Sequence, residues 1–393
     1  MQNYVIVPEI DQAKIGAKRL YPEWSGDMLR NRILKRVLML AMTVMTFGCA
    51  PKAAEINLIY PSFPEEPRIV YLKTYTGETI YRESSVLDIF FGTPVSFIGQ
   101  LYGVAAKGDK VYAAVFRPPA VVVFDDKERR VSYIGDSGPG SLSQPTGVVI
   151  AADGSIFVAD APGKKIQVYN PEGVHKRSIG KKDEFATPAG LAINNEMGRL
   201  YVADSRAHAV KVFSLQGEKL FEFGKPGTGN GEFNGPTNVA VDQRNGKVSV
   251  VDTINNRVQV FDKDGKFLLT YGTIGDAPGQ FSRPKGIGID SEGNAYVMDS
   301  VFGNFQIFDE SGQLLLAIGN YGTGPGEFTY PAGLYVDERD RIFVADSGNH
   351  RIQSFQYLSA KWKQQHPEEY KKYVRLQAEA KEKKEKEAKT LNK

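Results

Sequence analysis

The sequence is poor in the residues that carry redox and metal chemistry. Its 393 residues include one cysteine and four histidines. A single thiol excludes an intrachain disulfide, a Cys-x-x-Cys redox pair, a Cys-x-x-Cys-His haem attachment site and a four-thiolate zinc site. Four histidines limit metal chemistry but do not exclude it. We therefore expect no bound cofactor.

An excess of charge of one sign is also lacking. The 49 Lys and Arg residues nearly balance the 46 Asp and Glu residues, which leaves a formal charge of +3. Nucleic-acid-binding proteins normally carry a clustered basic surface, so no nucleic-acid partner is expected. Hydrophobic residues make up 41% of the chain, which is enough for a packed core. The 40 Gly, 21 Pro, 19 Tyr and 22 Phe residues favour an all-β protein of short strands joined by many turns.

The region before residue 50 has the organisation of a secretory signal. Four basic residues between positions 30 and 36 precede an apolar run over 37–47, which is shorter than the roughly 20 residues that a spanning helix needs. The run ends at Gly48-Cys49. A small residue followed by the only cysteine resembles the bacterial lipoprotein signal, in which the cysteine is lipidated and becomes the mature N-terminus. The alternative is a buried core cysteine after an ordinary hydrophobic helix.

The lipoprotein resemblance implies a division of the N-terminal region. Residues 1–48 are assigned to the signal region, and residues 49–67 to a linker after the lipidated Cys49. An acidic residue after the cysteine would resemble an inner-membrane retention signal, and Ala50 in that place favours the outer membrane. Residues 1–27 form a polar lead-in that is unusual for a signal peptide, so we expect translation to start at Met28.

One unit is repeated through the middle of the chain. A first anchor has the pattern Pro-x-Gly or Pro-x-Asn, and its five copies begin at Pro145, Pro188, Pro236, Pro284 and Pro331. A second anchor is an apolar run that ends in Asp, at Asp160, Asp204, Asp252, Asp299 and Asp346. Successive copies are 43 to 48 residues apart. A weaker copy precedes them, with Ala114 in place of the Asp. Two anchors that stay in step over five copies indicate an internal repeat.

Each copy contains four short β runs separated by turns. In the fifth copy these runs are 286–290, 295–299, 305–309 and 314–319. Four strands in a repeat of this length are typical of a β-propeller, whereas solenoid repeats are shorter and sandwiches do not repeat at a fixed period. The last copy has only three runs, and an orphan run at 68–74 precedes the first copy. We expect the orphan run to supply the missing strand and close a six-bladed ring over residues 68–357.

The best-preserved copies resemble a known repeat. Residues 344–353, VADSGNHRIQ, are similar to the NHL repeat consensus, and residues 255–261, NNRVQVF, match it with Asn256 in place of His. The whole pattern resembles bacterial six-bladed NHL propeller lipoproteins, over six copies and most of the chain after Cys49. This resemblance implies an NHL-type propeller with four-stranded blades. It implies little about activity, because one fold serves many functions.

The repeated Asp ends the second strand of each blade. Its carboxylate can accept hydrogen bonds from backbone N–H groups of the following turn. Arg257 and Arg351 follow their Asp by five residues, at a spacing that allows an ion pair. We interpret the five Asp residues as structural, because a residue repeated in every blade usually serves the repeat. The alternative is an Asp ring that binds a cation, which Ala114 in the first blade would interrupt.

Gly-rich connections recur over 227–231, 275–279 and 322–326 and superficially resemble phosphate-binding loops. Such loops need a helix directly after them, and here strands are expected on both sides, so we interpret them as blade-to-blade turns. His208 and His350 each follow a repeated Asp by four residues. Some NHL-type propellers are lyases with a metal held by histidines from several blades, which makes these two the weak candidates for a metal site. His350 also belongs to the repeat itself, so we expect no metal.

Residues that depart from the repeat are better candidates for a binding site. The antiparallel strand order places the Pro-x-Gly turn and the Asp turn on the same face of the disc. On that face, five residues differ from the repeat and could form a polar, partly cationic patch around the channel mouth: Arg206, Asn238, Arg283, Lys285 and Tyr330. The alternative is a solvated rim that binds nothing.

A charged tail follows the propeller over residues 358–393. Residues 361–393 contain 11 Lys and Arg against 6 Asp and Glu, whereas residues 49–360 contain 31 against 36. The near-neutral total thus conceals an acidic propeller and a basic tail. Glu382 and Lys386 have the i,i+4 spacing that supports a helix. The tail is either a solvated helix, or a helix that docks on a partner or on anionic lipid.

These features predict a lipid-anchored propeller on the periplasmic or extracellular side of the outer membrane, which binds a protein or small ligand without catalysis. The resemblance implies a role beside other envelope proteins, such as multihaem cytochromes. Without a haem motif, the chain would be a partner and not an electron carrier. The alternative is a propeller enzyme, a metal-dependent lyase or hydrolase that uses the channel mouth. The scarcity of histidine and the lack of a Gly-x-Ser-x-Gly motif disfavour it.

Overall fold

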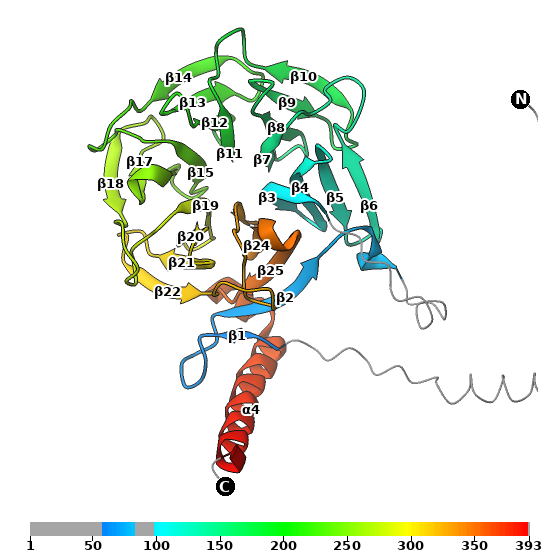
Figure 1. The fold of residues 1–393 in the computed structure, drawn as a ribbon, viewed down its shortest axis with the longest axis vertical. Helices are drawn as coiled ribbons and strands as arrows, with labels where there is room; N and C mark the ends of the chain where they lie inside the picture. Colours follow the sequence, from blue (N-terminus) through cyan, green and yellow to red (C-terminus); the bar gives the residue numbers. More distant parts are fainter. Residues whose placement is uncertain (1–56, 83–97, 392–393) are drawn as a thin grey trace, which may run out of the picture. The chain divides into compact units, whose positions relative to one another are not determined.

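Six antiparallel β-sheets surround one central axis in the computed structural model, which describes residues 57–82 and 98–391 (Figure 1). Each sheet is one blade, and the inner strands of the blades lie around the axis. The prediction of a six-bladed β-propeller is therefore confirmed. The predicted signal region, Cys49 and the first part of the predicted linker lie outside the described residues.

Blades one to five each contain four strands in chain order from the axis outward. Blade one consists of β3 (Gln100–Lys107), β4 (Lys110–Arg117), β5 (Ala120–Asp125) and β6 (Arg130–Ile134). Blade two consists of β7 (Pro145–Ile150), β8 (Ile156–Asp160), β9 (Lys165–Tyr169) and β10 (His175–Ile179). Blade three consists of β11 (Pro188–Asn194), β12 (Arg199–Asp204), β13 (Ala209–Ser214) and β14 (Lys219–Phe223). Blade four consists of β15 (Pro236–Val241), β16 (Val248–Asp252), β17 (Arg257–Phe261) and β18 (Phe267–Tyr271). Blade five consists of β19 (Pro284–Ile289), β20 (Ala295–Asp299), β21 (Asn304–Phe308) and β22 (Leu314–Ile318).

Blade six is completed by a strand from the other end of the propeller sequence. From the axis outward it contains β23 (Leu334–Val336), β24 (Arg341–Asp346), β25 (Arg351–Tyr357), β2 (Ile69–Tyr75) and β1 (Ile59–Tyr60). β2 pairs antiparallel with β25, from Ile69 opposite Tyr357 to Tyr75 opposite Ile352. The predicted closure of the ring by an N-terminal strand is thus confirmed. β1 lies in a segment predicted to be a linker, because a strand of two residues has no periodicity that a sequence can display.

The closing strand also contacts blade one. Lys73 and Tyr75 of β2 reach the carboxylate of Asp126, in the turn between β5 and β6, at 2.7 and 2.9 Å. Tyr81 donates to the same carboxylate at 2.6 Å from the 3-10 helix η1 (Glu78–Tyr81). Burial alone would raise the pKa of Asp126, but these three donors lower it below its usual value. The junction between the last and the first blade is therefore fixed by polar contacts as well as by strand pairing.

The hydrophobic core is divided among the contacts between blades. The buried apolar side chains of the propeller form six clusters within the described residues, each between two neighbouring blades. Fully buried phenylalanines fill the loops before the inner strands of blades three to six: Phe185, Phe233, Phe281 and Phe328. Each blade thus depends on its neighbours to bury its apolar surface, as is general for repeat proteins.

The direction of the inner strands distinguishes the two faces of the disc. We call the front face the one where inner strands begin and second strands end, and the back face the opposite one. Pro236 pairs with Asp252 at the front face, and the same pairing recurs in blades two, three and five. A register shift directly after each of these prolines marks a β-bulge. The residue after the proline is unpaired, so the bulge and not the alternation of the sheet sets its direction.

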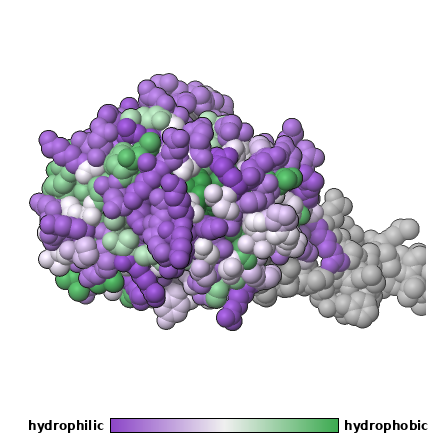
Figure 2. Space-filling view, turned by 90° about the horizontal axis from the view of Figure 1, so that it is seen from above, coloured by the Kyte–Doolittle hydropathy of each residue, from purple (hydrophilic) through white to green (hydrophobic). Residues whose placement is uncertain are grey.

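The outer rim contrasts with the core. The part of the rim seen in Figure 2 is mainly hydrophilic, with scattered hydrophobic residues. Exposed large apolar side chains occur singly on the outer strands, at Leu72 of β2 and, on the outermost strands of other blades, at Tyr133, Leu220, Leu268 and Leu315. Single exposed apolar residues are normal on a soluble surface and need no functional explanation.

Two helices follow blade six: α3 (Ala360–Gln365) and α4 (Pro367–Leu391). Trp362 is buried beside β2, and Gln377 of α4 is 6% exposed and donates to two backbone carbonyls of the segment before β2, at 2.6 and 3.1 Å. Further along, Lys386 and Glu382 form the expected i,i+4 pair at 4.0 Å. The tail is thus a helix that is docked at its start and solvated beyond. No helix in the described part of the chain is long and apolar enough to cross a membrane.

Candidate functional site

The repeated Asp residues are buried at the front face and hydrogen bonded throughout. All five are at most 2% exposed. Asp252 accepts from Asn255 at 2.8 Å, from Arg257 at 2.9 Å and from the backbone N–H of Asn234 at 2.7 Å. Asp346 has the same set of contacts, including Arg351 at 2.7 Å. The turn after the Asp is a short 3-10 helix in blades four and six, η2 (Thr253–Asn255) and η3 (Ser347–Asn349).

The backbone donors to these carboxylates differ from the prediction. Asp204 accepts from the N–H groups of Ala186 and Thr187, which belong to the loop leading into its own blade. Of the five carboxylates, that of Asp299 accepts hydrogen bonds from the turn that follows it, through the N–H groups of Val301 and Phe302. It also accepts a hydrogen bond from the incoming loop. The incoming loop lies beside the Asp because the inner strand begins where the second strand ends. The carboxylate therefore fixes the junction between loop and blade.

The two histidines lie at a turn position and not on the axis. His208 and His350 both have φ of 53°, and Lys164, Asn256 and Gly303 occupy the same left-handed position in other blades. The Nδ1 of His208 accepts a hydrogen bond from a backbone N–H of the next loop at 3.2 Å. Neither residue lines the central cavity. Within the described residues, no group of three or more His, Cys, Asp or Glu side chains is placed to hold a metal ion.

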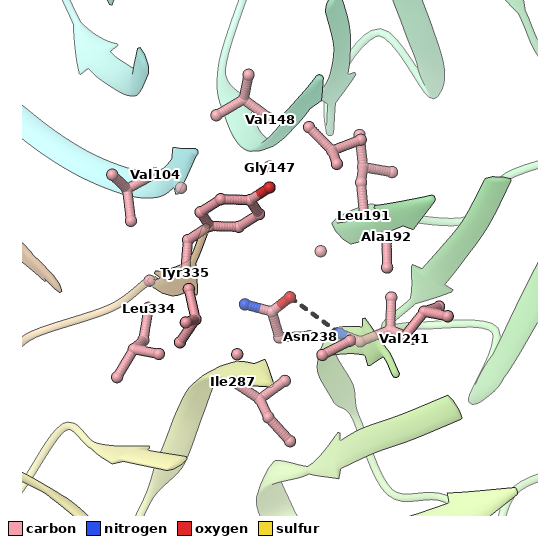
Figure 3. A pocket seen from close by; sticks show the side chains of 18 of the residues that line it. Val104, Gly147, Val148, Leu191, Ala192, Asn238, Val241, Ile287, Leu334 and Tyr335 are labelled. Carbon is pink, nitrogen blue, oxygen red and sulfur yellow. Dashed lines mark hydrogen bonds between the residues drawn. The ribbon is translucent and has the colours of Figure 1, made fainter. Parts of the chain in front are cut away.

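A cavity of about 760 Å³ lies on the axis between the inner strands (Figure 3). Its middle is lined by one aliphatic side chain from each blade: Val104, Val148, Leu191, Val239, Ile287 and Leu334. Next to them, toward the front face, five blades place a glycine where the inner strands converge. A Cβ on Gly147 would collide with the carbonyl oxygen of Ala189, and one on Gly286 with the backbone of Leu334. The glycines therefore permit the close approach that keeps the cavity narrow at this level.

Asn238 takes the place of this glycine in blade four, and it lines the cavity together with Lys285. The Oδ1 of Asn238 accepts from the N–H of Val239 at 2.9 Å, which leaves its amide NH₂ group directed into the cavity (Figure 3). Lys285 is the unpaired residue of the bulge in blade five. Its ammonium group has no hydrogen-bond or ion-pair partner among the residues that the structure describes. Two of the five predicted patch residues thus line the channel.

A third polar residue of the cavity was not predicted. Tyr335 of β23 occupies a position where the other blades have Ala, Val or Gly, and its hydroxyl is directed across the cavity toward Gly147 and Val148 (Figure 3). The hydroxyl has no hydrogen-bond partner within the described residues. Tyr335 is the one bulky residue among the six equivalent positions of the blades, and this difference could have identified it from the sequence. It was not identified because many other apolar runs of the chain also contain an aromatic residue.

The electrostatics differ between the two ends of the cavity. The pKa of Lys285, near the front face, is lowered mainly by burial and to a smaller extent by the positive charge of Arg283. Near the back face, burial is the main cause that raises the pKa of both Asp290 and Asp337. The positive charges of Lys285 and Arg283 favour an anion near the front end, and the carboxylates of Asp290, Asp337 and Glu338 disfavour one near the back end.

The other three predicted residues lie outside the cavity. Arg206 and Arg283 are exposed on the front face, and Tyr330 is 60% exposed with its ring edge-on to Tyr321, at 5.8 Å between centroids. The predicted single patch around the mouth is therefore divided. Asn238 and Lys285 belong to the channel, whereas Arg206, Arg283 and Tyr330 belong to the surface around it.

Exposed apolar side chains gather on the front face of blades four to six. We call them the front-face arc: Ile254, Ile274, Val301, Tyr321 and Tyr330, each 45 to 75% exposed. Hydrogen bonds connect the loops that carry them. The side chain of Asn256 donates to the carbonyl of Ser282 at 2.5 Å, and the N–H of Ser300 donates to the carbonyl of Arg283 at 3.0 Å. Four of these five residues were not predicted, because an apolar side chain in a loop does not stand out in a sequence as a polar departure from the repeat does.

The fold and its repeats define the class of this protein: it is a six-bladed β-propeller with NHL-type repeats. Residues 244–301 and 291–379 match the model of a family described as "6-bladed beta-propeller", and residues 185–213 match the model of the NHL repeat. Among curated proteins, the chain is 27% identical over 123 residues to "Protein brain tumor" of Drosophila melanogaster. That alignment covers 30% of this chain and 12% of the relative, so the chain spans only a small part of that protein.

Solved structures support the same fold. A Bacteroides thetaiotaomicron protein of unknown function is 16% identical with a TM-score of 0.57, over 73% of this chain and 75% of that one. A streptogramin B lyase is 12% identical with a TM-score of 0.51, over 67% and 95% of the two chains. An auxiliary nutrient binding protein of B. thetaiotaomicron is 15% identical with a TM-score of 0.51, over 67% and 70%. At these identities the likeness is one of fold.

Proposed function

We propose that this chain is a lipid-anchored propeller of the cell envelope that binds a protein partner on its front face and does not catalyse a reaction. The observation that carries the proposal is the front-face arc. Five large apolar side chains are exposed in loops of three consecutive blades, whereas the exposed apolar residues of the outermost strands occur singly. Large apolar side chains that are concentrated on one face and rimmed by polar residues are typical of sites for protein association.

The composition of the arc suits a stable partner. Tyrosine is enriched among the residues that dominate binding energy at interfaces, and here Tyr321 and Tyr330 already pack against each other. Arg206 and Arg283 lie exposed on the same face and offer positive charge at its margin. The resemblance to NHL propeller lipoproteins suggests an envelope protein such as a multihaem cytochrome as the partner. A binding role also agrees with the name of the nutrient binding protein that shares the fold.

The anchor is tested by replacing the only cysteine. Cells that express the full chain are supplied with labelled palmitate, and we expect the label to enter the wild-type protein and to be absent from the Cys49→Ala variant. The variant should also leave the outer-membrane fraction, because a lipid chain is what holds a soluble domain to a bilayer. Since the chain has no second thiol, a lipid cannot be attached to another cysteine in its place. A mature protein whose Cys49 is unmodified by mass spectrometry would refute the anchor.

The partner site is tested with paired variants. We expect Tyr321→Ala/Tyr330→Ala to weaken binding of the co-purified envelope partner at least about tenfold, as is usual for truncation of interface tyrosines. Charge reversal by Arg283→Glu should weaken it further at low ionic strength. The matched control is Leu268→Ala/Leu315→Ala, which removes exposed side chains of the outermost strands. Equal retention of the partner by all variants would place its site elsewhere.

A further inference from the structure

The central cavity has the properties of a small-molecule site that is separate from the front-face arc. Its volume of about 760 Å³ lies within the range of about 300–1,000 Å³ that small-molecule pockets occupy. The aliphatic residues of six blades form its wall, so an apolar body is favoured inside. Apolar walls with a few convergent polar groups are what distinguish ligand sites from packing defects.

Three polar groups of the cavity are hydrogen-bond donors without partners among the described residues. They are the ammonium of Lys285, the amide NH₂ of Asn238 and the hydroxyl of Tyr335, and none has a partner within the described residues. The orientation of the Asn238 amide follows from chemistry, because its oxygen must face the N–H of Val239. Leaving a hydrogen-bond donor without a partner in an apolar site has a free-energy cost. A ligand that accepts from these three groups would relieve that cost.

All three donors replace repeat residues in consecutive blades. Where blade five has Lys285, the equivalent residues of blades two and four are Thr146 and Thr237. Where blade four has Asn238, the other blades have Gly, and where blade six has Tyr335, the others have Ala, Val or Gly. The ring of Tyr335 packs against two core clusters. Neither the closure of the ring nor the packing of the blades requires the three donor groups, because the other blades achieve both without them. Their common property is that they direct donors into the cavity.

The back end of the cavity is unsuited to an anion. Asp290, Asp337 and Glu338 line it, and burial raises the pKa of the first two. The cations there already have partners, since Lys107 donates to backbone carbonyls and Arg244 bonds Asp242 and Glu310. Lys285 near the front end has no such partner. This asymmetry defines one orientation for an amphiphile, with its oxyanion toward the front face.

We propose that the central cavity binds a small amphiphile that consists of an apolar body and a carboxylate, with the carboxylate accepting from Lys285, Asn238 and Tyr335. The apolar body then lies among the aliphatic residues of the inner strands. Lys285 supplies the opposite charge, and Asn238 and Tyr335 supply hydrogen bonds from neighbouring blades. This site goes beyond the proposed partner surface, and neither depends on the other.

The test is calorimetric titration of the full chain with three probes: decanoate below its micellar concentration, decanol and acetate. We expect decanoate to bind at least about tenfold more tightly than decanol, because a charge-assisted hydrogen bond is lost in the alcohol. Acetate should bind weakly, because it lacks the apolar body. Decanoate that binds no better than decanol, or that does not bind, would overturn the proposal.

Lys285→Thr and Asn238→Gly use residues that other blades have at the equivalent positions, and Tyr335→Phe removes only the hydroxyl group. Lys285→Thr, Asn238→Gly and Tyr335→Phe should each weaken decanoate binding while leaving decanol binding and the melting temperature nearly unchanged, with the largest loss, about tenfold or more, for Lys285→Thr. Arg206→Ala, on the front face outside the cavity, is the matched control and should bind as wild type. Unchanged decanoate affinity in all three variants would refute the site. Tyr321→Ala/Tyr330→Ala should retain decanoate binding, so failure of the partner surface and failure of the cavity are distinguishable.

Discussion

Replacement of Asp346 by alanine is expected to lower the free energy of unfolding by about 3–5 kcal/mol, the range for breaking a buried ion pair from one side. Asp346 is completely buried and accepts from Arg351 at 2.7 Å, from Asn349 at 2.8 Å and from the N–H of Thr329 at 2.8 Å. The side chain of Arg351 is only 12% exposed. Without the carboxylate, its charge stays in a site of low polarity with no opposite charge beside it.

Chemical denaturation followed by circular dichroism measures this loss. The matched control is Asp309→Ala, whose carboxylate accepts from Ser311 and Gln313 in an outer turn, and a much smaller loss is expected there because water can replace it. Asp346→Asn should give an intermediate loss, since the amide oxygen can still accept from Thr329 but the charge is gone. Equal losses for Asp346→Ala and Asp309→Ala would show that the repeated carboxylate does not stabilise the blade junction.

The fold was predictable because the same sequence pattern recurs in successive blades. A proline that begins the inner strand and an aspartate that ends the second strand recur in step, and the structure pairs them directly, as Pro236 with Asp252. The count of strands then required the orphan run before blade one to complete blade six, where β2 is found. β1 was not predicted, because two residues of strand are fixed by pairing with β2 and not by a pattern of their own.

The site was predictable only in part, because the direction of a side chain depends on local backbone features, such as a β-bulge, that the repeat pattern does not indicate. The sequence placed Arg283 and Lys285 in one patch, but the bulge after Pro284 separates them, with Lys285 in the cavity and Arg283 on the surface. Strand alternation cannot indicate such a difference where a bulge interrupts it. Tyr335 was missed because an aromatic residue within a strand usually packs in a core, and its own ring does contact two core clusters.

Deletion of residues 57–75 is expected to abolish cooperative folding of the propeller. The deletion removes β1 and β2 and leaves β25 as an open edge, with its backbone groups unpaired over the length of the ladder. It also removes Ile69, Tyr71 and Tyr75 from the clusters that join blade six to its two neighbours, where each is at most 6% exposed. An open edge on an unclosed ring favours intermolecular strand pairing. We therefore expect aggregated protein by size-exclusion chromatography and loss of the cooperative melting transition.

Two point variants in β2 test its role in closing the ring without a deletion. Ile69→Ala removes a fully buried side chain and should cost about 2–5 kcal/mol, as for other large-to-small core substitutions. Leu72→Ala, in the same strand, removes a side chain that is 40% exposed and should cost much less. Equal stability of the two variants, or a monomeric and cooperatively melting deletion variant, would mean that β2 covers an already closed ring. If the expected order is found, the pairing of β2 with β25 closes the ring, because Ile69 can reach the core between blades five and six only when β2 occupies that edge.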